Sequence, residues 1–244
     1  SGNYQEIDNF YKDVFQEITI YNKVTNCRRL SSYYGISHNF SKENSNNEVT
    51  IYLLLHQYNH QGDLYDYIYR DNFWIQGIYT MDPSQKIELI YQLCKSIEEL
   101  HSYNIVHCDI KLNNALYHNN DRIILFDFGG SIDLDNKKII KVREIVGTMG
   151  YMCPENYQGI ISKKTDIYSL GVCMLEIWKG KIWNHGNTYK ECRKEVLAAL
   201  RSIKNTVLHK IIKSCIDTTL EHRPYIHTLL RKIILVKNNL QNTV

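Results

Sequence analysis

The chain has 244 residues, of which 43% are hydrophobic and 23% are charged, and its net charge is +3. This length allows one large domain or two small lobes with buried cores, and the composition is that of a globular protein. A charge so small argues against nucleic acid or an acidic membrane as a partner, and we find neither a signal peptide nor an apolar run of membrane-spanning length. The seven cysteines form no C-x-x-C pair, so we expect reduced thiols and a cytoplasmic or nuclear location.

The first predicted element is an amphipathic helix from about Gln5 to Val24, because apolar residues recur there at spacings of three and four. Its apolar stripe contains Ile7, Phe10, Val14 and Tyr21. Glu17 lies in the same stripe. Periodicity alone favours a carboxylate at the edge of the stripe that reaches solvent, since Glu is rarely buried without a partner. The alternative is an inward-facing carboxylate with a function.

A strand is predicted from Val49 to Leu55, where β-branched and apolar residues follow a polar, loop-like stretch from Asn39 to Asn47. The strand continues into the segment from His56 to Leu64. His56 and His60 have no Cys or acidic partner at ligand spacing, so we do not expect a metal site there.

A long helix is predicted to begin at Asp82. This residue can cap the helix, Pro83 stands at the first helical position and Gln85 at the third. Apolar residues then repeat at helical spacing up to His101, and the helix should end before Asn104. Because it leads directly into the next motif, it is the expected support of that motif.

That motif runs from His107 to Asn114 and reads His-Cys-Asp-Ile-Lys-Leu-Asn-Asn. Two short apolar runs with a polar turn between them separate it from Asp127-Phe128-Gly129, so a short hairpin is predicted in between. The hairpin would bring four polar side chains to one edge of a small sheet, namely those of Asp109, Lys111, Asn114 and Asp127.

These four side chains suit a metal-bound polyphosphate. Asn114 and Asp127 offer hard oxygen ligands for Mg²⁺. Lys111 can neutralise phosphoryl oxygens, and Asp109 remains free to accept a hydroxyl proton. Each short motif alone is common by chance, and Asp-Phe-Gly is also an ordinary end of a strand. Their joint spacing is what favours catalysis over a structural role.

The second half of the chain is predicted to be mainly helical. A polar and basic segment from Ser131 to Arg143 first leads to the stretch from Gly147 to Glu155. The helix from Asp166 to Trp178 is apolar nearly all round and ends at Gly180, so it should lie buried at the centre of a core. Further helices are predicted at residues 188–201, 206–216 and 224–240.

Two of these stretches resemble those of a known family. His-x-Asp-x-Lys-x-x-Asn at residues 107–114, with Asp-Phe-Gly at 127–129, resembles the catalytic loop and the metal-binding loop of eukaryotic protein kinases. The stretch from Gly147 to Glu155 is similar to the end of a kinase activation segment, and Lys111 together with Gly-Thr-x-x-Tyr matches the Ser/Thr branch. The resemblance covers about Glu6 to Leu235. It implies an α+β protein kinase-like fold, with a truncated small lobe at residues 1–57 (the regulatory helix and about two strands) and a mainly helical large lobe at residues 58–244.

The resemblance also implies roles at the catalytic centre. Asp109 would be the base that orients the substrate hydroxyl, and Lys111 would be the cation that neutralises phosphate. Thr148 would contact both of them. Asn114 and Asp127 would hold Mg²⁺.

Other implied roles concern ATP. Glu17 would lie on the regulatory helix and pair with a strand lysine that holds the ATP phosphates. The hinge between the lobes would bind adenine through backbone groups at Gln57, Tyr58 and Asn59. Leu116 would form the floor under the adenine ring.

Two further implied roles concern the frame of the site. Asp166 would brace the backbone of the catalytic loop, and Arg223 would pair with Glu155. If that pair is buried, removing either partner should cost roughly 3–5 kcal/mol, because the remaining charge is left uncompensated.

The small lobe departs from the family pattern. None of the 12 glycines forms a G-x-G-x-x-G and no Val-Ala-x-Lys lysine occurs, so the ATP clamp and the partner of Glu17 are absent from this chain. Cys108 stands where most kinases have an arginine that receives an activation-loop phosphate, which argues against that mode of switching. The chain opens with Ser1-Gly2 rather than Met, so we expect natural residues upstream.

Two hypotheses follow. The first is a Ser/Thr protein kinase that uses ATP and Mg²⁺ to phosphorylate a protein substrate, since every catalytic position of the large lobe holds a competent residue. Activity would then need an upstream segment, a partner kinase that completes the small lobe, or an unusual nucleotide pose. The second is a pseudokinase or large-lobe mimic that binds another kinase or its substrate and inhibits it, which the missing clamp favours.

Overall fold

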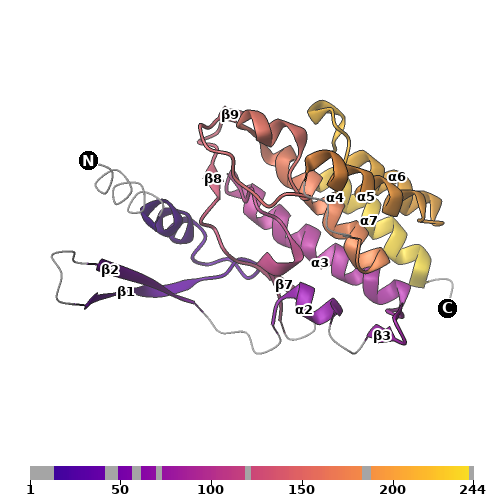
Figure 1. The fold of residues 1–244 in the computed structure, drawn as a ribbon, viewed down its shortest axis with the longest axis horizontal. Coiled ribbons are helices and arrows are strands. Elements are labelled where there is room, and N and C mark those ends of the chain that lie inside the picture. Colours follow the sequence, from indigo (N-terminus) through magenta and orange to yellow (C-terminus); the bar gives the residue numbers. More distant parts are fainter. Residues whose placement is uncertain are drawn as a thin grey trace.

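The computed structural model describes residues 14–41, 49–56, 62–69, 73–118, 122–182 and 188–241. Most of the helices form one body, and the N-terminal helix lies with a two-stranded ribbon at one side of it (Figure 1). A small sheet-containing part beside a large helical part is the arrangement expected of the predicted α+β fold. The predicted lobe boundary, after residue 57, falls among residues that are not described.

The small part consists of a helix at residues 14–23 and strands β1 (Tyr33–Ser41) and β2 (Val49–His56). The helix and β2 were both predicted, although the first turns predicted for the helix lie outside the described residues. The two strands pair in antiparallel fashion along their whole length. The loop predicted from Asn39 therefore begins later, because backbone pairing with β2 extends β1 to Ser41.

The centre of the large part is formed by α3 (Pro83–Ser102) and α4 (Lys163–Lys179), and both helices confirm their predictions. Each begins with a capping box, made by Asp82 with Gln85 in α3 and by Ser162 with Thr165 in α4. Every residue of α4 from Thr165 to Ile177 is buried, as predicted for a helix at the centre of a core.

Three more predicted helices surround this pair, and they are α5 (Tyr189–Arg201), α6 (Thr206–Cys215) and α7 (Ile226–Gln241). The last of them lies along α3, while α5 and α6 lie against α4 (Figure 1). Not predicted were α2 (Leu64–Tyr69), the short hairpin of β3 (Trp74–Ile75) and β4 (Ile78–Tyr79), and the 3-10 helices η2 (Leu112–Asn114), η3 (Pro154–Gln158) and η4 (Leu220–His222). Among the described residues, no helix has both the length and the apolar character that a membrane crossing requires.

Three strand pairs bring segments of the large part together. β6 (Ala115–His118) and β7 (Arg122–Leu125) form the predicted hairpin. β5 (Ile105–Val106) pairs with β8 (Ile132–Asp133), and β9 (Ile140–Lys141) pairs with β10 (Ile160–Ile161). The last two pairs fix both ends of the segment that contains the Gly147 motif.

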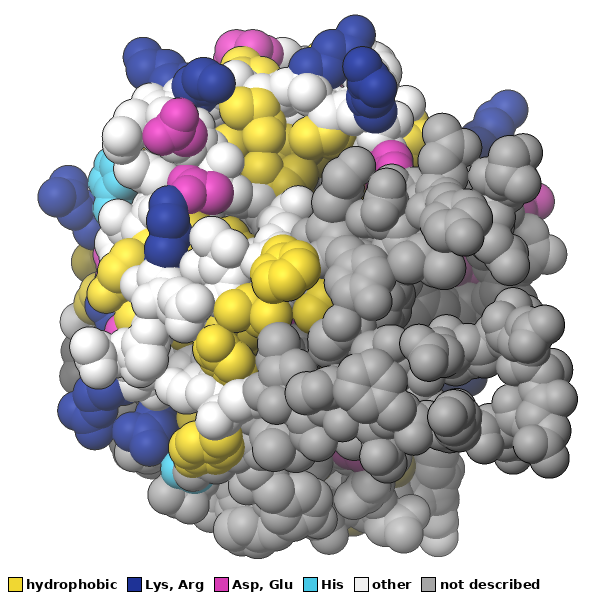
Figure 2. All heavy atoms as spheres, turned by 90° about the vertical axis from the view of Figure 1, so that its left-hand side faces the viewer, with side chains coloured by type: hydrophobic (Ala, Val, Ile, Leu, Met, Phe, Trp, Pro, Cys, Tyr) yellow, Lys and Arg dark blue, Asp and Glu magenta, His cyan; other side chains and the backbone are white. Residues whose placement is uncertain are grey.

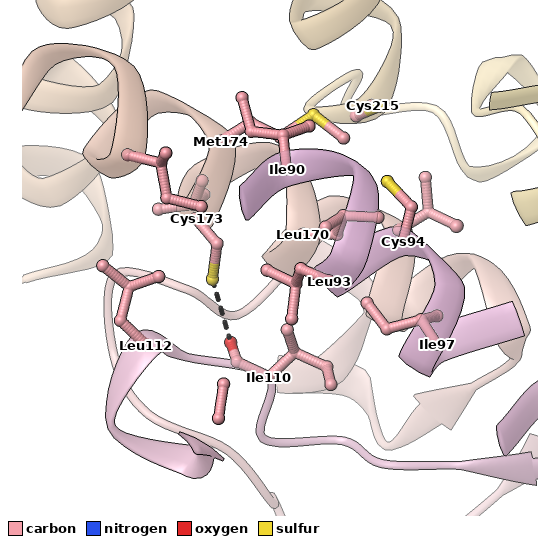
Figure 3. Packing of buried hydrophobic residues seen from close by; sticks show 14 of the residues in the cluster. Ile90, Leu93, Cys94, Ile97, Ile110, Leu112, Leu170, Cys173, Met174 and Cys215 are labelled. Carbon is pink, nitrogen blue, oxygen red and sulfur yellow. Dashed lines mark hydrogen bonds between the residues drawn. The ribbon is translucent and has the colours of Figure 1, made fainter. Parts of the chain in front are cut away.

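The catalytic loop, residues 107–114, is anchored in the core between α3 and α4 (Figure 3). Ile110 and Leu112 are fully buried, and the Cys173 thiol of α4 donates to the carbonyl oxygen of Ile110 at 3.9 Å. The backbone is extended at Lys111, with φ at −152°, so neighbouring side chains point to opposite sides. Ile110 and Leu112 therefore enter the core, while Asp109 and Lys111 face away from it.

The predicted pair of Glu155 and Arg223 is present and buried. Both terminal nitrogens of Arg223 donate to the two carboxylate oxygens of Glu155, at 2.5 and 2.8 Å, and only 1% of the arginine is exposed. The guanidinium also donates to the carbonyl oxygens of Asp217 and Lys164 at 2.8 and 3.0 Å. The pair thus joins η3 to the start of α4 and to the segment before α7.

We expect Arg223→Met to lower the free energy of unfolding by about 3–5 kcal/mol, because it leaves the Glu155 carboxylate buried without its cation. Urea denaturation measures this change. Lys95→Met is the matched control, since Lys95 pairs with Glu98 on the surface and such pairs contribute only about 0–1 kcal/mol. Equal losses in the two variants would contradict a special role for the buried pair.

Candidate active site

The backbone of the catalytic loop is held by Asp166 of α4. Its carboxylate accepts the backbone N–H of His107 at 2.9 Å and that of Cys108 at 3.0 Å, and it contacts Nε2 of His101 at 2.8 Å. Cys108 has φ of 69°, a left-handed conformation that costs energy in a residue other than glycine. The two hydrogen bonds to a fully buried carboxylate offset that cost and confirm the predicted bracing role of Asp166.

Asp109 lies at the centre of the candidate site. Its Oδ2 accepts hydrogen bonds from Nζ of Lys111 at 2.8 Å and from Nδ2 of Asn114 at 3.1 Å. Nζ of Lys111 also donates to Oγ1 of Thr148 at 2.9 Å, so Thr148 reaches the site as predicted. Oδ1 of Asp109 is buried and has no hydrogen-bond partner among the described residues. One carboxylate oxygen is thus fixed while the other remains an unused acceptor.

The charge of Asp109 is set by opposing effects. Burial raises its pKa, but the polar contacts with Lys111 and Thr148 and the positive charge of Lys111 outweigh burial. The net result is a pKa below the ordinary value of 3.8, so the carboxylate is ionised at neutral pH.

Asn114 and Asp127 lie at the same end of the β6–β7 hairpin. Ala115 pairs with Leu125, and the backbone N–H of Phe126 donates to the carbonyl oxygen of Asn114 at 3.2 Å. The amide nitrogen of Asn114 donates to Asp109, which makes its amide oxygen the atom suited to a cation. The predicted convergence is therefore present in the backbone, with Asn114 buried and Asp127 exposed.

A cation at this end of the hairpin would need ligands from outside the protein. The described residues contain no cluster of three or more His, Cys, Asp and Glu side chains that could hold a metal. Mg²⁺ characteristically binds through one or two carboxylates with water and substrate phosphates. Asn114 and Asp127 fit a site in which the protein supplies few ligands and water and phosphates supply the rest.

Glu17 faces the site rather than solvent. A Cβ built on Gly129 would lie 3.6 Å from Oδ1 of Asp127 and 3.7 Å from Oε2 of Glu17, so both carboxylates border the same glycine. Burial raises the pKa of Glu17, the negative charge of Asp127 raises it further, and a hydrogen bond with Tyr21 opposes both effects. Glu17 is therefore partly buried on the side of Asp127, and the function that the inward alternative gives it stays a prediction.

Comparison with known proteins assigns the family. A model of the protein kinase domain matches residues 2–238 of the chain. The chain belongs to the protein kinase family. It is 35% identical over 154 residues to a protein of Acanthamoeba polyphaga mimivirus whose name describes it as a serine/threonine-protein kinase; this match covers 60% of the chain and 55% of the relative.

Two further relatives are cellular proteins. The chain is 33% identical over 138 residues to the membrane-associated tyrosine- and threonine-specific cdc2-inhibitory kinase of Drosophila melanogaster, a match that covers 52% of the chain and 26% of the relative. It is 35% identical over 147 residues to the serine/threonine-protein kinase-like protein At3g51990 of Arabidopsis thaliana, covering 58% of the chain and 39% of the relative. The matches thus span about half or less of the length of these relatives.

A cluster of three buried rings in this kinase domain was not predicted. Phe128 lies between Tyr21 of the first helix, at 5.0 Å between ring centroids, and His107 of the catalytic loop, at 5.4 Å. All three side chains are almost completely buried. The sequence signal was weak but present, since Tyr21 lies one helical turn after Glu17 on the same stripe. These ring contacts couple the position of that helix to the catalytic loop.

Cys108, which stands where most kinases have an arginine, packs among apolar residues. Its side chain is 2% exposed and belongs to a small apolar cluster with Val106, Ile132, Leu134 and Ile161. Burial raises the pKa of the thiol well above its ordinary value, so it is neutral. The kinase domain therefore packs its activation segment here through apolar contacts, without a cation at this position for a phosphate.

The predicted adenine site is only partly described. Gln57, Tyr58 and Asn59 lie outside the described residues. Leu116 lies in β6, where Ala115 and Tyr117 are buried and Leu116 is partly exposed. Because neighbouring strand residues face opposite sides, Leu116 lies on the face away from the core.

We expect Glu17→Gln to raise the melting temperature at neutral pH, because it removes one of two like charges beside Gly129. The folded-state pKa of Glu17 is raised above its ordinary value of 4.5, so its ionised form weakens the fold. That penalty is present at neutral pH and disappears as the pH falls below 4.5, where both states are protonated. Melting curves of variant and wild type should therefore converge in acid.

The matched control is Glu144→Gln, which removes the same charge from an exposed position. It should leave the melting temperature unchanged. If Glu17→Gln destabilised the fold at neutral pH, the inferred repulsion between Glu17 and Asp127 would be wrong.

Proposed function

We propose that this chain is a Ser/Thr protein kinase that transfers the γ-phosphate of ATP to a hydroxyl group of a protein substrate. The observation that carries the proposal is the asymmetry of Asp109. Its Oδ2 is held by Lys111 and Asn114, while its buried Oδ1 has no partner among the described residues. Buried acceptors are almost always satisfied, so an unused one in a site suggests a ligand donor.

A substrate hydroxyl is the donor that fits. Oδ1 of Asp109 would accept its proton and orient the oxygen for in-line attack on the phosphate. The lowered pKa of Asp109 keeps it ionised for this role. Lys111, between Asp109 and Thr148, would neutralise negative charge on the transferred phosphoryl group.

ATP and Mg²⁺ would bind beside these groups. Asn114 and Asp127 would hold the metal, and the hinge and Leu116 would hold adenine, as the resemblance implies. The metal would supply positive charge beside the carboxylates of Glu17 and Asp127 and would neutralise phosphate oxygens. The proximity of these carboxylates supports a cation at this place.

The second candidate is a binding module that engages another kinase or its substrate without catalysis. It is favoured by the absence of a Gly-rich clamp and a Val-Ala-x-Lys lysine from this sequence. Phosphoryl transfer depends mainly on positioning and electrostatics, so losing these groups would reduce nucleotide affinity and rate. Nucleotide binding and phosphate transfer therefore separate the two candidates.

We expect ATP with Mg²⁺ to raise the melting temperature, because a ligand that binds only the folded state stabilises it. At about a hundredfold excess over Kd the gain in free energy is about 2.7 kcal/mol. Differential scanning fluorimetry measures the shift. ATP without Mg²⁺ should have a much smaller effect. Asp127→Asn should lose the metal-dependent part, whereas Asp135→Asn, the same change at an exposed residue, should retain it.

We expect phosphate transfer from radiolabelled ATP to a generic Ser/Thr protein, with Asp109→Asn slower by roughly a hundredfold or more. Asp135→Asn again serves as the control and should transfer at the wild-type rate. Binding of ATP without transfer would favour the binding module, and failure of both would contradict an enzymatic role for this chain.

A further inference from the structure

A cavity lies at the start of α4, apart from the candidate active site. It has a volume of about 330 Å³, and small-molecule sites span roughly 300–1,000 Å³. Its wall comes from four segments: residue 104 after α3, residues 134–139 after β8, residues 162–164 at the start of α4, and residues 220–225 before α7. None of the proposed catalytic residues borders it.

The wall of this cavity is strongly basic. It contains Lys137, Lys138, Lys163 and Lys164, and Glu221 is its only acidic member. The whole chain carries a net charge of just +3. Four of the 29 Lys and Arg residues of the chain thus border one cavity that has a single acidic residue in its wall.

Two of these lysines, Lys163 and Lys164 at the start of α4, form hydrogen bonds with neutral groups. Nζ of Lys163 donates to Oδ1 of Asn104 at 2.7 Å, and the amide of Asn104 donates in turn to Oδ1 of Asn136 at 2.7 Å. Nζ of Lys164 donates to the carbonyl oxygen of Glu221 at 2.9 Å and lies 4.7 Å from the centre of the Tyr225 ring. Neither lysine forms an ion pair with a carboxylate of the described residues.

A bound anion would stabilise the positive charges of these two lysines. Burial lowers the pKa of Lys163, which means that its charge is poorly solvated. Charged hydrogen bonds to an anion are about twice as strong as those between neutral groups. The start of α4, capped by Ser162, adds the positive end of a helix dipole to the same wall.

A mostly apolar cavity adjoins the basic one. It has a volume of about 390 Å³ and shares Ile139, Leu220 and Glu221 with the basic cavity. It adds Ile140 and Ile160, together with Lys141 and with Glu155, whose carboxylate is paired with Arg223. Figure 2 shows hydrophobic side chains between groups of Lys and Arg at the top of the face that it draws. The two cavities together form a groove with one charged and one apolar part.

We propose that this groove binds a protein segment that carries a phosphorylated Ser or Thr beside an apolar residue. A phosphate brings nearly two negative charges and three acceptor oxygens, which several lysines can share. Free phosphate would not use the apolar part, and nucleic acid would need a longer basic track. Phosphopeptide binding does not require phosphoryl transfer, so it is independent of the function proposed above.

The test is fluorescence anisotropy with a short labelled peptide that carries one phosphoserine between leucines. The wild-type protein should bind this phosphopeptide, and it should bind the unphosphorylated peptide at least about tenfold more weakly. The affinity for the phosphopeptide should fall as the salt concentration rises. Lys137→Gln with Lys138→Gln removes two exposed lysines whose side chains form no ion pair with the described residues, and it leaves the hydrogen bonds of Lys163 and Lys164 in place. This double variant should weaken binding about tenfold. Asp127→Asn should bind as wild type does.

The matched control is Lys179→Gln with Lys181→Gln. Lys179 ends α4, about 24 Å along the helix from Lys163, and both lysines are exposed, so the change in net charge is the same. This variant should retain the affinity. Four results would overturn the proposal: no binding, equal weakening by both double variants, displacement by inorganic phosphate as readily as by unlabelled phosphopeptide, or tighter binding of a single-stranded oligonucleotide.

Discussion

The buried carboxylate of Asp166 is the constraint on which the candidate site depends. It lies in α4, the most deeply buried helix of the large part, and its three polar contacts reach His101 at the end of α3 and His107 and Cys108 of the catalytic loop. A buried carboxylate without such partners would be strongly unfavourable, so the loop and both helices must keep this arrangement together. The same bonds hold Cys108 in its left-handed conformation, which turns the chain toward Asp109.

Beyond Cys108, successive side chains of the catalytic loop face the core and the candidate site in turn. Ile110 and Leu112 enter the core, and Asp109 and Lys111 face Thr148 on the other side. The first helix is then coupled to the loop through the Tyr21, Phe128 and His107 rings. A displacement of that helix would move Phe128 and, next to it, Asp127. The small part therefore influences the site through packing, whatever it contributes to nucleotide binding.

What could be predicted from the sequence was local. The cap at Asp82, the apolar character of α4 and the polar turn of the β6–β7 hairpin each determine structure within a few residues. The resemblance added Asp166, Thr148 and the Glu155–Arg223 pair, since motif spacing carries information about contacts that composition does not. All of these contacts are present.

What could not be predicted depends on contacts between distant segments. The pairs β5–β8 and β9–β10 are too short to leave a periodic signal. The basic cavity unites residues from 104 to 225, and no spacing links them in the sequence. Periodicity could not place Glu17 beside Asp127 and Gly129, because these residues lie more than a hundred positions away.

The candidate site contains more negative than positive side chains. Among the described residues, the carboxylates of Glu17, Asp109 and Asp127 gather there, and Lys111 is already engaged by Asp109. A nucleotide triphosphate entering alone would add negative charge beside Asp127 and Glu17, which Coulomb repulsion opposes. On the proposed function, Mg²⁺ would remove this conflict, because it would be attracted to both the carboxylates and the phosphates. Metal and nucleotide should then bind cooperatively, and the cation would take over part of the neutralisation that the resemblance assigns to a strand lysine.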